Sequence, residues 1–361
     1  MGAVQYECAA GYKVMVMESV GLLAEVTRGN RVESQHFGRA VVVDAHGQVV
    51  WSCGDHDAVT YPRSTVKALL GLELVESGAA ERLQLSDAEL ALTCASHGGE
   101  AAHAEVALRL LQRVGRGVEA LECGAHWPTY EPAGRALAQA GQQACPLHNN
   151  CSGKHAGLIC LACDSGVDPE GYIEPDHQIQ KRVTRVLEEV TGAAHREEER
   201  GTDGCSMPTY AIPLRALAHG FARFGSGVGL TADRARAAKV LREAVAKEPF
   251  MVAGTGRYDT ALMKELGLGA FIKMGAEGVM VAALPDEGLG IAIKINDGAN
   301  RAAEVAMSAL MARFGGSALL GKAASSGVLE QTAHQSLRNW QGRDVGIIRA
   351  ASILRRSDSS K

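Results

Sequence analysis

The sequence lacks several features that would place the protein in a membrane or on nucleic acid. None of its apolar runs approaches the ~20 residues that a transmembrane helix needs. The N-terminus lacks the basic segment, apolar stretch and small-residue cleavage site of a signal peptide. A net charge of −4 provides no broad basic field for nucleic acid or an anionic membrane. We therefore expect a cytoplasmic protein with neither nucleic acid nor a membrane as its partner.

Common frameworks of stability and catalysis are missing as well. The nine cysteines are odd in number and scattered over the chain, which argues against a disulfide framework. The sequence contains no His-Glu-x-x-His metal motif, no Gly-x-x-x-x-Gly-Lys-Ser/Thr phosphate loop and no Gly-x-Ser-x-Gly elbow. The usual sequence signatures of metalloproteases, P-loop nucleotidases and α/β-hydrolases are therefore absent.

What the chain does contain is the composition of a globular protein, with 46% hydrophobic and 22% charged residues over 361 positions. Strand-type runs cluster near both ends, with several helical segments between them. These runs occupy residues 24–27 with an extension through 33, then 39–43, 49–52, 270–275, 278–283, 290–295 and 344–349. A glycine- and serine-bearing connector is expected at 315–327.

This order predicts an α/β (α+β) fold in which N- and C-terminal strands form one antiparallel sheet and a helical lobe is inserted between them. We expect a single domain over residues 1–361, with 21–62 and 268–350 in the sheet lobe and 63–267 in the mainly helical lobe. The ends, 1–20 and 351–361, are expected to be disordered tails. A site would form in the cleft between the lobes.

The most informative stretch is Arg63-Ser64-Thr65-Val66-Lys67, at the head of a helix whose residues 66–75 are apolar on nearly every face. Ser64 and Lys67 are three residues apart and share one face of that helix. An amine beside a hydroxyl at a buried helix start can activate a serine without histidine. The alternative is a surface serine beside a lysine that extends its amine to solvent.

Four further clusters combine glycine with reactive side chains, at residues 96–100, 149–155, 201–205 and 273–275. Glycine permits close backbone approach, and the neighbouring side chains can perform acid–base or nucleophilic chemistry. Any one cluster is typical of a capped loop. Five such clusters in one chain, counting the Ser64 stretch, favour a shared site.

Cys151 and Cys205 suggest a metal site, because each lies within three residues of another candidate ligand. Lys154 and His155 follow the first cysteine, and Asp203 precedes the second. Two thiolates with a nitrogen and an oxygen donor suit zinc. Isolated cysteines are more often buried thiols, so that alternative stays open. The pair at 160 and 163 lies inside an apolar helix and is interpreted as core packing.

Taken together, the segments 62–67, 94–97, 149–155, 202–205 and 273–278 resemble the rhizobial-type (class 3) L-asparaginases, a family similar in fold to serine β-lactamases and glutaminases. The resemblance covers roughly residues 23 to 349. It implies a homodimeric L-asparaginase that hydrolyses L-asparagine to L-aspartate and ammonia through an acyl-enzyme on a serine.

Carried over residue by residue, the resemblance makes Ser64 the nucleophile with Lys67 beside it, and Ser96 and Lys273 complete two Ser-Lys pairs. The remaining positions match those that bind zinc (Cys151, Lys154 and Cys205) and those that lie near the substrate (Arg63, His155 and Asp203). A lysine base must be neutral, and two lysines in one cleft would depress the pKa of one of them. A lysine that ligates zinc must be neutral too. Whether the zinc is structural, substrate-orienting or incidental stays open.

Two other functions compete with this prediction. Analogy of fold allows a β-lactamase- or penicillin-binding-type acyl transferase, although such a periplasmic enzyme should carry an export signal. A catalytically inactive, zinc-stabilised amino-acid-binding protein is the second alternative. Release of ammonia from L-asparagine separates the three.

Overall fold

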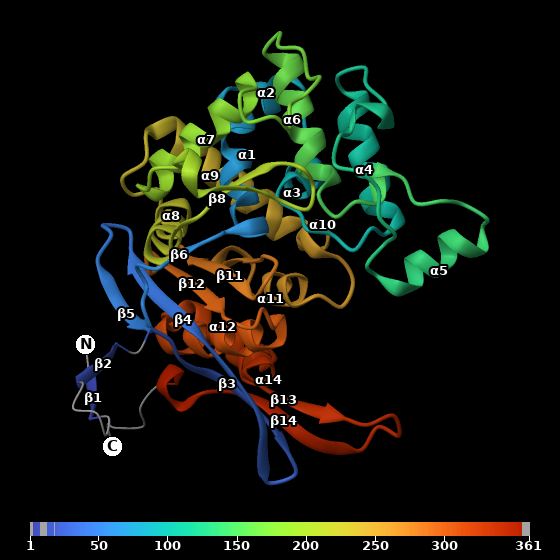
Figure 1. The fold of residues 1–361 in the computed structure, drawn as a ribbon. Helices are drawn as coiled ribbons and strands as arrows, with labels where there is room; N and C mark the ends of the chain where they lie inside the picture. The colour runs from blue at the N-terminus through green and yellow to red at the C-terminus, as the bar shows by residue number, and fades with distance from the viewer. Residues whose placement is uncertain (1–2, 8–12, 18, 356–361) are drawn as a thin grey trace.

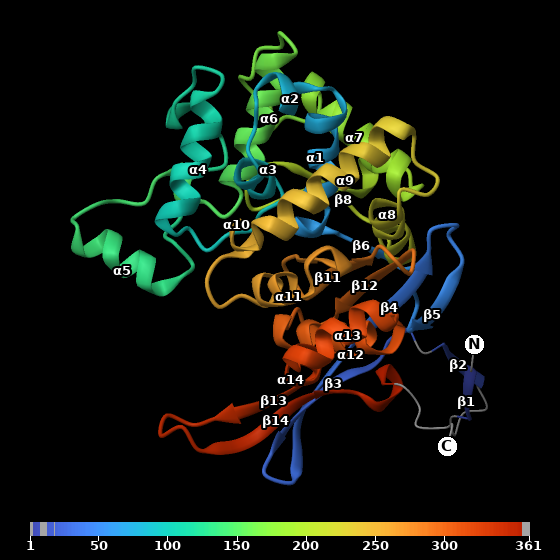
Figure 2. The same cartoon turned by 180° about the vertical axis from the view of Figure 1, so that it is seen from behind.

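The computed structural model describes residues 3–7, 13–17 and 19–355 (Figures 1 and 2). The two segments predicted to be disordered tails therefore lie partly outside the described residues. Within the first of them, β1 (Ala3–Glu7) pairs antiparallel with β2 (Lys13–Met17), a hairpin that the sequence pattern did not predict. Within the second, the 3₁₀ helix η6 (Ser352–Leu354) follows the last strand.

One eight-stranded antiparallel sheet unites the two ends of the chain, as predicted. The strand order is β10-β11-β12-β4-β3-β14-β13, and β5 pairs with β4 outside this path. The strands are β3 (Gly21–Arg28), β4 (Arg31–Asp44), β5 (Val49–Cys53), β10 (Phe271–Met274), β11 (Val279–Leu284), β12 (Leu289–Ile295), β13 (His334–Arg338) and β14 (Asp344–Ala350). Because α8 and α12 both pack against β11 and β12, these strands are buried almost throughout.

Two predicted segments differ from the structure. The run 24–33 is a hairpin rather than one strand, since β3 ends at Arg28 and Gly29 takes a φ of 54° that reverses the chain into β4. The expected connector at 315–327 forms helix α13 (Ser317–Ser326) and leads into α14 (Val328–Ala333). Its glycines and serines misled the prediction, because buried Leu319 and Leu329 give these short helices an apolar side.

The segment between the two groups of strands is mainly helical, as predicted. Its helices are α1 (Lys67–Glu76), α2 (Ala79–Arg82), α3 (Asp87–Thr93), α4 (Ala101–Gln112), α5 (Glu131–Gln139), α6 (Ser152–Asp164), α7 (Gln178–Thr191), α8 (Leu214–Ser226), α9 (Ala232–Lys247), α10 (Pro249–Ala253) and α11 (Tyr258–Leu266), and α12 (Asn300–Phe314) follows the central strands. Short elements connect them: η1 (Arg63–Val66), η2 (Val118–Ala120), η3 (Pro146–His148), η4 (Glu197–Glu199), η5 (Gly267–Gly269), β6 (Val59–Thr60), β7 (Arg200–Thr202), β8 (Pro208–Tyr210) and β9 (Ile212–Pro213). No helix among the described residues has the length and apolar character to cross a membrane.

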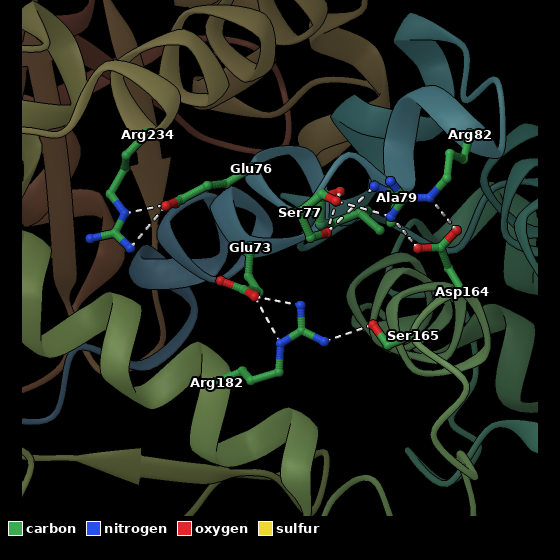
Figure 3. Close-up of polar contacts among 10 residues, drawn as sticks. Glu73, Glu76, Ser77, Ala79, Arg82, Asp164, Ser165, Arg182 and Arg234 are labelled. Carbon is green, nitrogen blue, oxygen red and sulfur yellow. Dashed lines mark hydrogen bonds and ion pairs between the residues drawn. The ribbon is translucent and has the colours of Figure 1, made fainter.

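Helix α1 is the buried centre of the helical lobe. It packs against α6, α7 and α9, and Leu69 and Leu72 are fully buried. Figure 3 shows how its C-terminal half is fixed: Arg182 of α7 donates to Glu73 at 2.8 Å, and Arg234 of α9 donates to Glu76 at 2.8 Å. These charge-assisted bonds hold α1 against both neighbours and so fix the position of its N-terminal end.

Candidate active site

Lys67, the first residue of α1, is where three of the predicted motifs meet. Its side chain is buried, and its Nζ donates to Ala95 O at 2.6 Å, Ser96 Oγ at 2.9 Å and Cys151 Sγ at 3.1 Å. An ammonium has three hydrogens, and these three acceptors use all of them. The structure therefore joins Lys67 to Ser96, with no hydrogen bond to Ser64 among the described residues. The serine–lysine pair that forms is therefore Ser96 with Lys67, which are far apart in sequence.

Ser64 lies in η1, one turn before Lys67, and lines a small cavity with it. The cavity also receives Arg63, Lys154 and Asp203. Its volume is about 20 Å³, and a space of roughly 10–15 Å³ already holds one water molecule. A ligand as large as an amino acid can enter only after the lining side chains move.

Lys273, near the end of β10, is fully buried, and its Nζ donates to Met274 O at 2.7 Å. Burial, with Lys67 and Arg257 nearby, lowers the pKa of Lys273 to about 7, although Asp259 at 4.0 Å opposes the shift. The amine is therefore partly neutral at neutral pH. The sequence predicted that crowding would depress the pKa of one of two lysines, and in the structure the pKa of Lys273 is lowered.

Gly275 brings the end of β10 against the Ser64 turn. A Cβ at this position would lie 3.0 Å from Thr65 Cγ2 and 3.2 Å from Pro62 O, the residues on either side of Arg63 and Ser64. A larger side chain would push the two segments apart. The glycine at 275 therefore lets the end of β10 pack directly against the turn that carries Ser64.

Gly153 has the same effect at the start of α6. Its Cβ would lie 2.2 Å from Leu92 O, so only glycine allows α6 to approach the end of α3 this closely. The contact sets Cys151 within hydrogen-bond distance of Lys67 and brings Lys154 to the cavity that Lys67 lines. The polar 149–155 motif thus reaches the site through backbone packing.

The three predicted zinc ligands come together. Lys154 Nζ donates to Cys205 Sγ at 3.0 Å, and the Cys205 thiol in turn interacts with Cys151. The hydrogen bond between the two cysteine side chains, with Lys67 and Lys154 nearby, holds the pKa of Cys151 well below its ordinary value. The same hydrogen bond, together with burial, raises the pKa of Cys205. Of the two sulfurs, Cys151 therefore loses its proton more readily than Cys205.

This cluster relies on a lysine for its third donor. Among the described residues, no three histidine, cysteine, aspartate or glutamate side chains are placed to hold a metal ion. Burial lowers the pKa of Lys154, but Cys205 and Cys151 outweigh it and raise the value overall. A metal ion would therefore have to displace a proton from this amine. Two sulfur donors and an amine fit a soft cation such as zinc by their chemistry.

Arg63 and Asp203, both predicted to lie near a substrate, form an ion pair at the cavity. Arg63 Nε and Nη2 donate to Asp203 Oδ1 at 2.9 and 2.7 Å. Arg63 holds this position with a φ of 52°, a left-handed backbone that is strained for a residue other than glycine. Strain of this kind is concentrated at binding sites. The pair presents a cation and an anion side by side at the cavity wall.

His155, the third predicted substrate residue, is fully buried on α6. Tyr172 Oη accepts from the Glu122 N–H and lies 2.6 Å from His155 Nδ1. The His155 side chain also interacts with the side chain of Cys205. Burial lowers the pKa of His155 to about 4. The result is a neutral imidazole held between Tyr172 and Cys205.

Several residues of the site were not predicted from the sequence. Asp259 faces Lys273, Tyr172 orients His155, and His195 and Tyr210 line the cavity. Asp259 follows the glycine loop at 254–257, which was its only sequence signal. The other three stand in segments without glycine clusters or spacing patterns. Cys160, interpreted as core packing, is fully buried with its thiol donating to Leu110 O.

Solved structures similar to this chain include a β-lactamase, a D-alanine carboxypeptidase and simvastatin synthase. A β-lactamase from Mycobacterium bovis is 13% identical and covers 77% of this chain and 95% of its own, with a TM-score of 0.38. A D-alanine carboxypeptidase from Burkholderia cenocepacia is 13% identical over 79% and 93%, with a TM-score of 0.38. Simvastatin synthase from Aspergillus terreus is 12% identical over 72% and 87%, with a TM-score of 0.33. These similarities are too weak to assign a fold or a function to this chain.

Sequence comparison is more specific. Among curated proteins, none matches the chain significantly. The sequence profile of the family described as L-asparaginase II matches residues 24–350, which include every predicted site residue. This match agrees with the resemblance seen in the motifs and supports a hydrolase. The chain belongs to the L-asparaginase II family.

Proposed function

We propose that the protein is an L-asparaginase that converts L-asparagine to L-aspartate and ammonia through an acyl-enzyme on Ser64. The observation that carries the proposal is the arrangement of the two buried lysines. Lys67 is fully engaged with Ser96 and its neighbours, whereas Lys273 lies in surroundings that favour the neutral amine. One lysine thus orients the polar groups and the other can accept a proton, a division of roles that acid–base catalysis needs.

In the proposed reaction, Ser64 Oγ attacks the side-chain amide carbon of asparagine and its proton passes to the neutral amine of Lys273. The backbone N–H of Ser64 is our candidate donor to the oxyanion. Collapse of the tetrahedral adduct breaks the C–N bond, and the nitrogen leaves as ammonia after taking up the proton. Water then attacks the ester, which releases aspartate and restores the Ser64 hydroxyl. We assign Lys67 the role of positioning Ser96.

The Arg63–Asp203 pair supports an amino acid as the substrate. A free amino acid carries a carboxylate and an ammonium on one carbon, and the cavity wall offers the opposite charges side by side. On binding, Arg63 and Asp203 would give up their contact with each other, and each would contact the substrate group of opposite charge. This exchange also accounts for the small cavity, since the paired side chains fill the space that the substrate would take.

We further propose that Cys151, Lys154 and Cys205 hold a zinc ion. When bound, the ion would supply a cation that ties the start of α6 to the turn at 203–205. Its ligands flank Lys67 and Asp203, so the role we assign to it is to fix the positions of these side chains.

Ammonia release tests the proposed function. Purified protein mixed with L-asparagine should release ammonia, with L-glutamine and a penicillin as comparison substrates. Hydrolysis of the penicillin without release of ammonia would favour the acyl transferase instead. Binding of asparagine without turnover would favour the amino-acid-binding protein, and either result would contradict the proposal.

A further inference from the structure

The hairpin of β13 and β14 projects beyond the rest of the molecule as an arm (Figures 1 and 2). At its tip, Trp340 is 106% exposed, which makes it the most exposed large hydrophobic side chain of the described residues. The tip is ordered by Asn339, whose Oδ1 accepts from the N–H groups of Gln341 and Arg343. A fully exposed tryptophan on an organised turn is costly in water and typical of a binding surface.

An apolar cavity lies at the base of the same arm. It measures about 610 Å³ and is bounded by α12, α13, α14, the first residue of β13, Ala350 of β14 and Arg355. Its walls are mostly small and aliphatic, and three charged residues, Arg313, Glu330 and Arg355, also line it. A tryptophan ring fits a space of this size and composition, and the Glu330 carboxylate could accept from an indole N–H. Within one copy of the described chain, Trp340 lies at the tip of the arm and the cavity lies at its base, so Trp340 cannot fill the cavity of its own copy.

Symmetry connects the tip with the cavity. β13 is the last strand of the sheet among the described residues, so its outer edge is unpaired. If the edges of two copies pair antiparallel about Ser336, His334 of one copy lies opposite Arg338 of the other. At about 3.3 Å per residue, Trp340 then stands at the level of Thr332 in the second copy. Thr332 is next to cavity residue Ala333.

Charge agrees with this pairing. The guanidinium of Arg343, at the arm tip, and the carboxylate of Glu330, at the cavity edge, have no hydrogen-bond or ion-pair partner among the described residues. In the paired arrangement, each Arg343 approaches the Glu330 of the second copy. A two-fold axis doubles every contact, so both tryptophans and both cavities are used.

We propose that two copies of this chain clasp each other through the β13–β14 arms, with Trp340 of each inserted into the apolar cavity of the other. Two buried tryptophans, with the cavity wall that they cover, contribute on the order of 800 Å². A stable dimer buries roughly 1,200–2,000 Å², so the paired β13 edges supply the remainder. The resemblance predicts a homodimer; this proposal identifies the surface that forms it.

The first test measures the dimer dissociation constant by analytical ultracentrifugation of the full chain. Trp340→Ser should weaken the dimer roughly 30-fold or more, as loss of a central aromatic anchor does. Trp127→Ser, at a half-exposed tryptophan elsewhere, is the matched control and should leave the constant unchanged. Tryptophan emission of the wild type should shift to longer wavelength on dilution, and Trp340→Ser should lose this shift.

The second test exchanges charges between the two surfaces. Glu330→Arg should weaken the dimer several-fold, and Glu330→Arg with Arg343→Glu should restore it, because the pair re-forms with its signs exchanged. A wild type that is monomeric at all concentrations would overturn the proposal. So would a Trp340→Ser dimer as tight as the wild type, or a double variant weaker than Glu330→Arg alone.

Discussion

Replacing Lys273 with methionine should remove activity and at the same time change how stability depends on pH. The buried amine has a pKa of about 7 instead of 10.5, and each pKa unit corresponds to about 1.4 kcal/mol. Holding Lys273 in the native protein at or below pH 7 therefore costs on the order of 5 kcal/mol. Methionine, apolar and of similar length, carries no such cost.

This figure is already net of the attraction between Lys273 and Asp259, which raises the pKa of the amine. At 4.0 Å, a charge pair in an effective dielectric of 20 is worth up to about 4 kcal/mol. Lys273→Met should therefore stabilise the protein by several kcal/mol at pH 7. Lys273→Met combined with Asp259→Asn also removes the buried carboxylate that has lost its cation, and should stabilise the protein further.

The pH dependence is the decisive readout. Between pH 7 and 10.5 the unfolded chain keeps a proton on Lys273 that the native protein has lost. The free energy of unfolding of the wild type should therefore rise with pH over this range, by up to about 1.4 kcal/mol per unit from this group. The variant should lack that contribution. Urea unfolding at pH 7, 8 and 9 measures the difference, and an identical slope in both proteins would refute the reasoning.

Activity should also rise with pH as Lys273 loses its proton. Because the proposed base must be neutral, kcat should rise with pH through about 7 in the wild type. Asp259→Asn removes the carboxylate that favours the charged amine, so the rising limb should move to lower pH. Activity that falls above neutrality in the wild type would rule out a lysine base.

The remaining predictions concern the nucleophile, the metal and the substrate contacts. Ser64→Ala should lower kcat by several orders of magnitude with the fold retained; if Ser96→Ala loses turnover and Ser64→Ala keeps it, the roles are reversed. Elemental analysis should find about one zinc per chain, lost in Cys151→Ser and kept in the matched Cys160→Ser, and equal loss in both would contradict the site. Arg63→Gln should raise KM far more than it lowers kcat, and an unchanged KM would remove it from the substrate site.

Periodicity and turn chemistry predicted the parts of the fold that depend on neighbours in sequence. The apolar run after Val66 identified a buried helix, and alternating runs near both ends identified the strands of one sheet. Those patterns fail where composition misleads: Gly315 and Gly316 suggested a connector, yet Leu319 anchors a helix there. Local signals also placed the reactive clusters at the ends of elements, where the structure has them.

The pairing within the site could not be predicted from spacing. Ser64 and Lys67 are close in sequence, but the hydrogen bond from Lys67 goes to Ser96, across a distance set by how α1 and α3 pack. Asp259 reaches Lys273 through the contact of α11 with β10, and the glycine loop that precedes Asp259 does not reveal this partner. Tertiary packing decides such contacts. The need for glycine at 275 becomes clear only when the residues packed against it are known.

The acyl-enzyme is the central claim, and rapid-quench mass spectrometry of the full chain tests it most directly. Protein mixed with L-asparagine and quenched in acid within the first turnovers should gain the mass of one aspartyl group. Proteolysis should locate that mass on the peptide with Ser64, and Ser64→Ala should not acquire it. An adduct on Ser96, or ammonia release by a fully active protein that never carries an adduct under these conditions, would contradict the account.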